Sequence, residues 1–475
     1  MKDGTITRNI FGLSSKGAEG MSFRASGGNY DIMTPQEAKM IGKKTGKKLD
    51  EFTLGAELPT ETTEVKKIRL VTPLDAGSAN LGDTQLQLGL VFGRKYTFEV
   101  ESYTNKPPRD LSSIKWVMRY HSLKDNTWKE WDAKATGNKV VFEFNEPDLC
   151  GRFFHLKAYI NSKESVEFEK TWHHNRFRHF DKKTVYDQIA ERMAQPWRIQ
   201  QGGTSLCGMA ALFYAMIKKD SAAYETMAKN LFRMGEHTVG NYTFQPHEKA
   251  LEMYDRTPAS IDGMHIYAAD WIVMATARSK ESLNDQFVYK GTETGSIDQL
   301  KAVNWPEMLT NMCKNVGVFG SSVSYGLSKP SIAAKKAPIS GRTADFLFDT
   351  DLRALQQIDT KYKAGKQILL MIDADMIDDE GSYYSVVDIA RDSHWVVYEG
   401  GLEFFDKEGN ATTELGDVKS LKFQIFTWGR NPTTSVYRRY TDGKEYIDSA
   451  VTKFRTTGIK VKSFKSNYYG YIEVS

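Results

Sequence analysis

The residues with the clearest capacity for chemistry surround Cys207, in the segment Gln200-Gln-Gly-Gly-Thr-Ser-Leu-Cys-Gly-Met-Ala-Ala-Leu-Phe-Tyr214. A glycine-rich turn leads into an apolar run, which predicts a helix over residues 206–217 with Cys207 in its first turn and Thr204 or Ser205 as its cap. The unpaired N–H groups and the partial positive charge of a helix start stabilise a thiolate. We therefore expect a lowered pKa for Cys207 and a role as nucleophile.

A thiolate nucleophile needs a partner that takes its proton and later protonates the leaving group. His394 is the best candidate, because it opens the apolar strand Ser393-His-Trp-Val-Val-Tyr398, where core packing does not require a histidine. A base on a strand that faces a nucleophile on a helix start is a common arrangement for acyl transfer.

The residue that would orient His394 stays open. If strands 393–400 and 421–428 pair as a hairpin, Thr427 lies near His394 and offers it a hydroxyl group. Three carboxylates in the same part of the chain are alternatives: Asp392, Asp406 and Asp417.

The whole chain has the composition of a globular protein. Its 475 residues are 40% hydrophobic and 26% charged, which excludes a wholly disordered chain and predicts about three domains. The net charge of +4 is too small to argue for a nucleic-acid partner. The three cysteines lie far apart, so neither a disulfide scaffold nor a CxxC metal pair is expected, and the chemistry needs no cofactor. We expect neither a signal peptide nor a transmembrane segment, because no sufficiently long apolar run occurs.

Three regions are predicted along the chain. Residues 1–62 are rich in Gly, Lys and Thr and are interpreted as a flexible N-terminal arm. Residues 63–175 alternate between apolar and polar positions, which predicts an all-β, immunoglobulin-like sandwich. Residues 183–475 begin with helical periodicity and end in apolar strands, which predicts an α+β domain with a helical part followed by an antiparallel sheet.

The individual elements follow from the same periodicities. In the sandwich region we expect strands at 65–71, 96–102, 114–120, 140–144 and 153–160. In the region after 183 we expect helices at 206–217, 224–234, 270–277 and 344–362. Strands are expected there at 367–373, 393–399, 421–428 and 468–474, and a long surface loop at 317–341.

The spacing around the cysteine resembles the signature of papain-like cysteine peptidases. Gln201 lies six residues before Cys207, and Gly208 follows directly and keeps the space beside the sulfur open. In that family the Gln side chain and the Cys backbone N–H form the oxyanion hole. The resemblance implies these roles for Gln201 and for the amide of Cys207.

The later half of the chain resembles the same family. After the strand that begins at His394, Phe426-Thr-Trp-Gly429 resembles the family's Asn-Ser-Trp-Gly, and Tyr469-Gly-Tyr-Ile-Glu-Val474 resembles its closing strand. Phe426 stands where the family has its orienting Asn and cannot accept the imidazole N–H. The resemblance covers about residues 185–475, and it implies a papain-like fold and amide hydrolysis through a thioester acyl-enzyme.

A wider resemblance is to the papain-like toxin domains of bacterial polymorphic toxins. It is carried by four short motifs, Ser205–Gly208, Ser393–Val397, Phe426–Gly429 and Asn467–Tyr471. The sandwich region, through Pro73–Gly77 and Lys95–Val100, resembles delivery modules of type VI secretion cargo. Together they imply an antibacterial effector that is made in the bacterial cytoplasm and exported into target cells without a cleaved signal peptide. The implied partners are a peptide, protein or peptidoglycan substrate, a cognate immunity protein and a component of the secretion machine.

Three other functions remain open. The same dyad could serve a peptidoglycan amidase or endopeptidase, or an amine acyltransferase or deamidase. The dyad could also be vestigial in a binding or delivery protein, which Phe426 favours. Other reactive residues receive a structural interpretation: Cys150 as a buried thiol, His173, His174 and His179 as a solvated linker face rather than a metal cluster, and the carboxylates of Asp373–Glu380 as a solvated turn rather than a Ca²⁺ loop.

Overall fold

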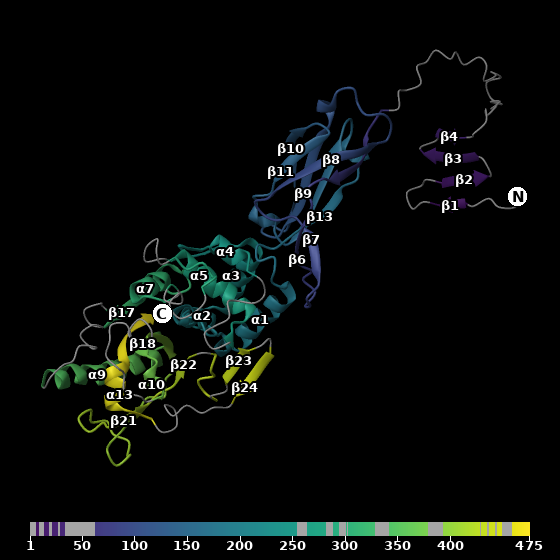
Figure 1. The fold of residues 1–475 in the computed structure, drawn as a ribbon. Coiled ribbons are helices and arrows are strands. Elements are labelled where there is room, and N and C mark those ends of the chain that lie inside the picture. Colours follow the sequence, from purple (N-terminus) through teal and green to yellow (C-terminus); the bar gives the residue numbers. More distant parts are fainter. Residues whose placement is uncertain are drawn as a thin grey trace, which may run out of the picture. The chain divides into compact units, whose positions relative to one another are not determined.

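The computed structural model describes residues 62–253, 264–281, 288–293, 301, 303–327, 342–378, 393–427, 429–434, 437–441, 444–448 and 458–475, with four short strands between residues 6 and 33 (Figure 1). In this structure the chain is a mixed α+β protein with antiparallel sheets. Two compact units are present, residues 1–64 with 104–107, and residues 65–103 with 108–475. Among the described residues, no helix has the length and apolar character needed to cross a membrane.

The first unit contains a sheet where the sequence suggested a flexible arm. Its four strands pair in chain order: β1 (Ile6–Arg8), β2 (Ser14–Ala18), β3 (Met21–Ser26) and β4 (Asn29–Met33). The signal for β3 is the alternation of Met21, Phe23 and Ala25 with polar residues. This alternation is a weak signal in the sequence, because the strands are short and mostly polar. Residues 34–61 of the expected arm lie outside the described residues.

Two antiparallel sheets and a hairpin occupy the region where a sandwich was predicted. The first sheet has the order β10-β9-β12-β13, the second has the order β11-β8-β5, and β6 pairs with β7. Their bounds are β5 (Val65–Leu70), β6 (Asp75–Ser78), β7 (Leu86–Gly89), β8 (Lys95–Tyr103), β9 (Lys115–Ser122), β10 (Thr127–Thr136), β11 (Lys139–Glu143), β12 (Arg152–Tyr159) and β13 (Glu169–His173). The sheets share one core, in which the rings of Trp116 and Phe142 lie 6.2 Å apart and those of Phe144 and Phe154 lie 4.8 Å apart. The five predicted strands are confirmed to within two residues.

The remainder of the chain contains helices that alternate with strands. The helices are α1 (Lys182–Ala194), α2 (Cys207–Lys219), α3 (Ser221–Met234), α4 (Glu248–Leu251), α5 (Ala268–Lys280), α7 (Pro306–Asn315), α9 (Arg342–Lys363), α10 (Asp375–Asp378) and α13 (Val461–Asn467). The main sheet has the order β17-β26-β18-β19-β22, with β17 (Ser322–Tyr325), β18 (Gln367–Asp373), β19 (Ser393–Tyr398), β22 (Ile425–Phe426) and β26 (Tyr468–Val474).

Smaller sheets complete this region. They are the hairpin of β14 (His237–Val239) and β15 (Tyr242–Phe244), the sheet of β16 (Met264–His265), β23 (Tyr437–Thr441) and β24 (Lys444–Asp448), and the sheet of β20 (Glu403–Phe405), β21 (Ser420–Lys422) and β25 (Ile459–Lys460). The strand expected over residues 421–428 is therefore divided, since β21 pairs with β20 and β25 whereas β22 pairs with β19.

The main sheet is buried on both faces. Alternate residues of β18 point to opposite faces, so Leu369 and Met371 pack in the core that contains α2, α3 and α5. Leu370 and Ile372 pack in a second core with residues of α9 and α13. Burial on both faces explains the continuous apolar run from Ile368 to Ile372. It also fixes the register of β19, which carries His394 between these two cores.

Candidate active site around Cys207 and His394

Cys207 begins helix α2 and is only 7% exposed. The backbone N–H groups of Trp395, Gly208 and Cys207 itself interact with the thiol and favour the thiolate. Burial outweighs them and raises the pKa of the Cys207 thiol to about 11. The lowered pKa expected from the helix start is therefore not present in this structure, because desolvation of the sulfur is the larger effect.

His394 lies in β19 with 4% of its surface exposed, and its Nε2 atom hydrogen-bonds the hydroxyl of Thr427 at 2.6 Å. The expected pairing is present in part, because β22 pairs with β19 and places Val397 opposite Phe426, whereas residues 420–422 pair with other strands. Burial lowers the pKa of His394 to about 3, so the ring is neutral at physiological pH. Thr427, proposed from the sequence as one of several orienting residues, is the described candidate that contacts His394.

The sheet separates the two reactive side chains. Trp395 and Val397 pack in the core of Cys207, whereas Val396 packs on the opposite face. By strand alternation His394 belongs to the face of Val396. No hydrogen bond joins the described residues Cys207 and His394, and the thiol instead meets the backbone N–H of the next residue, Trp395. Proton transfer between thiol and imidazole therefore requires a rearrangement at the start of β19.

Gln201 is buried in the loop that precedes α2. Its Nε2 atom donates to the carbonyl of Thr204 at 2.7 Å, and the Thr204 hydroxyl donates back to the carbonyl of Gln201 at 2.6 Å. Gly202 has a φ of +58°, and a Cβ atom there would lie 3.0 Å from the backbone of His265 and Ile266. The loop is thus tightly folded, and the side-chain amide of Gln201 is used in a hydrogen bond within it.

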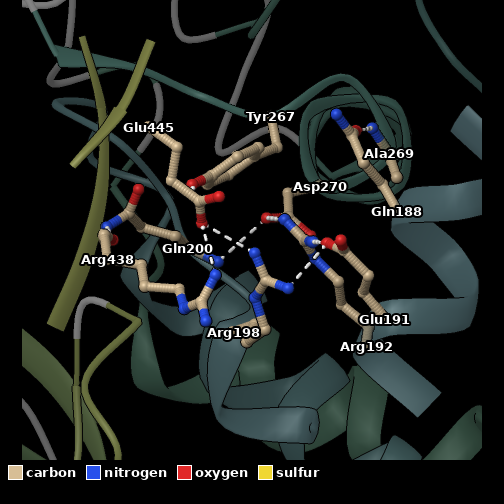
Figure 2. Close-up of polar contacts among 10 residues, drawn as sticks. All are labelled: Gln188, Glu191, Arg192, Arg198, Gln200, Tyr267, Ala269, Asp270, Arg438 and Glu445. Atoms are coloured by element: carbon tan, nitrogen blue, oxygen red, sulfur yellow. Dashed lines mark hydrogen bonds and ion pairs between the residues drawn. The ribbon is translucent and has the colours of Figure 1, made fainter. Parts of the chain in front are cut away.

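A fully buried ion pair anchors the same loop (Figure 2). Arg192 of α1 donates from Nε to Asp270 Oδ1 at 3.0 Å and from Nη2 to Asp270 Oδ2 at 2.8 Å. The backbone N–H of Gln200 donates to the same Oδ2 atom at 3.1 Å. Neither Arg192 nor Asp270 has any exposed side-chain surface. This pair fixes the chain just before Gln201, so it positions the segment that leads to Cys207.

A second ring of contacts joins this loop to the β23–β24 hairpin (Figure 2). Arg198 lies 2.7 Å from Glu445 of β24 and 3.0 Å from Glu191 of α1. The side chain of Gln200 donates to the carbonyl of Arg438 in β23 at 2.6 Å. Gln200 therefore uses both its backbone and its side chain to hold the loop, and neither role was apparent from the sequence.

Asn304 caps helix α2 and is a residue of the candidate site that sequence reasoning missed. Its Oδ1 atom accepts from the backbone N–H of Gly208 at 2.9 Å and of Met209 at 3.3 Å, and its carbonyl accepts from the indole of Trp395 at 2.9 Å. A Cβ atom on Gly208 would lie 2.5 Å from Asn304 Cβ, so the space expected to be open beside Cys207 is filled. The expected caps do not serve this role, because the N-cap position is Leu206, which makes no side-chain cap bond. No local signal points to Asn304, which lies 96 positions after Gly208.

The other predicted residues are placed away from His394 or cannot be described. Asp406 accepts hydrogen bonds from the N–H groups of Glu408 and Asn410 in its own turn, and Asp417 is exposed. Asp392 and Trp428 lie outside the described residues. The ring of Phe426 stacks on Tyr214 of α2 at 3.8 Å, so it packs against the nucleophile helix.

Within the described part of the chain, no cluster of three or more His, Cys, Asp or Glu side chains is arranged to hold a metal ion. Cys150, Cys207 and Cys313 are all free, buried thiols. In comparisons with known proteins, no family model matches the chain, and neither a curated protein nor a solved structure is significantly similar to it.

Proposed function

We propose that the chain is a papain-like, cysteine-dependent amide hydrolase that acts on peptide or protein substrates. Cys207 is the nucleophile, His394 the proton carrier, and Thr427 the residue that orients the imidazole. The observation that best supports this proposal is the buried 2.6 Å hydrogen bond from His394 to Thr427, in a strand whose next N–H meets the thiol of Cys207. This supports the proposal because His394 has a hydroxyl partner and directly precedes the residue whose N–H contacts a cysteine at a helix start.

The proposed reaction runs through a thioester. Cys207 Sγ attacks the carbonyl carbon while His394 takes the thiol proton, and the oxyanion is bound by the backbone N–H of Cys207 and the side-chain amide of Gln201. His394 then gives the proton to the leaving amine as the C–N bond breaks. Water attacks the thioester with His394 as base, which releases the acid and restores the thiol.

The observed geometry corresponds to a resting state in this proposal. The pKa of Cys207 is raised to about 11 and that of His394 lowered to about 3, both by burial, so the two groups are neutral between these values. Substrate binding would have to bring the imidazole to the thiol, and the Gln201 amide out of its bond to Thr204. The enzyme would thus be closed until a substrate or a partner opens it.

The biological role proposed with this chemistry is that of an antibacterial effector carried by a contact-dependent secretion machine and neutralised by an immunity protein. Peptidoglycan is the alternative substrate, and an amine is the alternative acceptor. A second function, binding without catalysis, is favoured by the absence of a hydrogen bond between the described residues Cys207 and His394.

The test combines thiol labelling with hydrolysis assays on the full chain. Iodoacetamide labelling at pH 7.5, read by mass spectrometry, should be roughly 300-fold slower at Cys207 than at a free thiol of pKa about 8.5, because its pKa is about 11. Addition of casein or of purified cell-wall sacculi should accelerate labelling of Cys207 but not of the equally buried Cys313. Hydrolysis of one of these substrates should be lost in Cys207→Ala and His394→Ala and retained in Cys313→Ala.

Two results would count against catalysis. The first is hydrolysis that survives in Cys207→Ala. The second is that neither hydrolysis nor amine incorporation is detected, while the labelling rate of Cys207 is the same with and without substrate and the same in His394→Ala. This combination would favour the binding function.

A further inference from the structure

The outer face of the sheet β10-β9-β12-β13 carries a row of aromatic rings. Its register places Trp128 of β10 opposite His121 of β9, and Phe153 of β12 opposite Trp172 of β13. The pairing of β12 with β9 sets Phe153 level with His121. Because side chains directly opposite each other share a face, the four rings form one row across the four strands. The alternate residues of β9 and β12 point inward and form the core.

Two rings of this row project into solvent. Trp128 is 55% exposed and Phe153 is 51% exposed. Each meets a less exposed ring edge to face, Trp128 with His121 at 5.6 Å and Phe153 with Trp172 at 5.4 Å. Since neighbouring strands lie about 4.8 Å apart, Trp128 and Phe153, two strands apart, are separated by about 10 Å. The face thus offers two fixed apolar platforms.

A charged row runs beside the aromatic row. The same register aligns Glu130, Arg119, His155 and Lys170. The guanidinium of Arg119 lies over the rings of Trp128 at 5.0 Å and Phe168 at 3.9 Å. With the described residues the Arg119 side chain makes neither an ion pair nor a hydrogen bond, whereas Glu130 is paired with Lys163 at 3.0 Å. Arg119 is therefore a cation held in place by rings without a counter-charge.

Two other basic side chains on this face are affected by the charge of Arg119. The pKa of His155 is lowered by burial and, in addition, by the charges of Arg119 and Lys170. The pKa of Lys157 on the same face is lowered mainly by burial; the charges of Glu130 and Glu164 raise it, and that of Arg119 lowers it. An anionic group placed here would relieve this repulsion. The patch nevertheless contains Glu130, so it does not suit a ligand with a charge on every unit.

We propose that this face binds an extended polysaccharide that carries carboxylates, with sugar rings on Trp128 and Phe153 and a carboxylate on Arg119. The apolar faces of pyranose rings stack on exposed aromatic rings. In an extended β-linked chain alternate sugars present the same face, which fits two platforms separated by one strand. A single-stranded nucleic acid would bring a phosphate with every base against Glu130 and Asp132. The proposal is independent of the chemistry at Cys207.

The experiment is native affinity electrophoresis of the full chain in gels that contain hyaluronan, a β-linked chain in which every second sugar carries a carboxylate. We expect retardation of the wild type, and a weakening of affinity by about tenfold in each of Trp128→Ala, Phe153→Ala and Arg119→Gln. The matched controls are Val141→Ala and Arg69→Gln, exposed positions in strands β11 and β5 of the opposite sheet, which should bind like the wild type. Thermal unfolding checks that each variant is folded.

Each alternative outcome overturns a stated part of the proposal. Absence of binding to hyaluronan, or equal weakening in the control variants, removes the site. Equal binding to neutral hydroxyethylcellulose removes the role of Arg119. Preferential binding to oligo(dT) replaces the polysaccharide by a nucleic acid.

Discussion

The replacement Asp270→Asn removes the charge that compensates a buried guanidinium. In the wild type the carboxylate accepts two hydrogen bonds from Arg192 and one from the N–H of Gln200. The Asn side chain has the same shape, but its NH2 group faces donors on Arg192 or Gln200. Because Arg192 has no exposed surface, its charge cannot be solvated by water. Breaking one partner of such a pair costs about 3–5 kcal/mol of unfolding free energy.

The expected effect is large enough to be seen in thermal unfolding followed by circular dichroism. For a domain of this size about 2–4 °C of Tm corresponds to each kcal/mol, so the Tm of the affected transition should fall by roughly 6–20 °C. The matched control is Glu191→Gln. Glu191 also contacts Arg192, at 3.0 Å, but it is 43% exposed, so its loss should cost no more than about 1 kcal/mol.

A second variant separates charge compensation from packing. The pair Arg192→Met with Asp270→Leu removes both charges at similar volume and should regain most of the stability lost in Asp270→Asn. The reasoning would be refuted if Asp270→Asn cost no more than Glu191→Gln. It would also fail if the double variant were as unstable as the single one, because the loss would then come from packing rather than from an uncompensated cation.

Three further predictions concern the candidate site and its acid stability. Thr427→Val removes the hydroxyl partner of His394, so the unfolding free energy should fall by about 1–3 kcal/mol. The kcat for a hydrolysed substrate should also fall, with little change in KM. Thr427→Ser should keep both the stability and the kcat of the wild type. Asn304→Ala removes the cap of α2 and should lower the unfolding free energy, measured with urea, by about 1–2 kcal/mol. If the loss were no greater than in Asn311→Ala, at an exposed position, the capping role of Asn304 would be contradicted. Burial lowers the pKa of His173 to about 4 and that of His394 to about 3, below the unfolded value of about 6.5. The stability that these neutral rings contribute is therefore complete above pH 6.5 and is lost as the pH falls towards 4. For His173 alone the unfolding free energy should fall by about 3 kcal/mol. A urea midpoint that stays constant from pH 7 to 4.5 would contradict this prediction.

Local patterns were sufficient to predict the elements with strong apolar periodicity. The run Gln367–Asp373 gave the bounds of β18, and Tyr468–Val474 gave those of β26. The pairing of β19 with β22 was also predictable, and with it the contact between Thr427 and His394 across 33 positions, because both segments are apolar strand patterns. These features depend on residues that are close along the chain or on one strand pairing.

Features that depend on the tertiary structure could not be predicted. Asn304 reaches α2 from a distant segment, and Arg192 meets Asp270 across 78 positions, with nothing in either local sequence to suggest it. The prediction of a lowered pKa for Cys207 was wrong for a related reason. The helix start favours the thiolate as expected, but the burial that outweighs it arises from packing against Trp395 and Asn304.

The position of β26 within the main sheet has a consequence for folding during synthesis on the ribosome. This strand follows every other strand of the sheet in the sequence, yet it lies inside the sheet, between β17 and β18. Until residue 474 has been synthesised, β18 has an unpaired edge and two cores lack one of their walls. Translation proceeds from the N-terminus, so helix α2 with Cys207 is made long before the sheet that supports His394 can close. A nascent or truncated chain would therefore contain both reactive residues but not the framework that holds them.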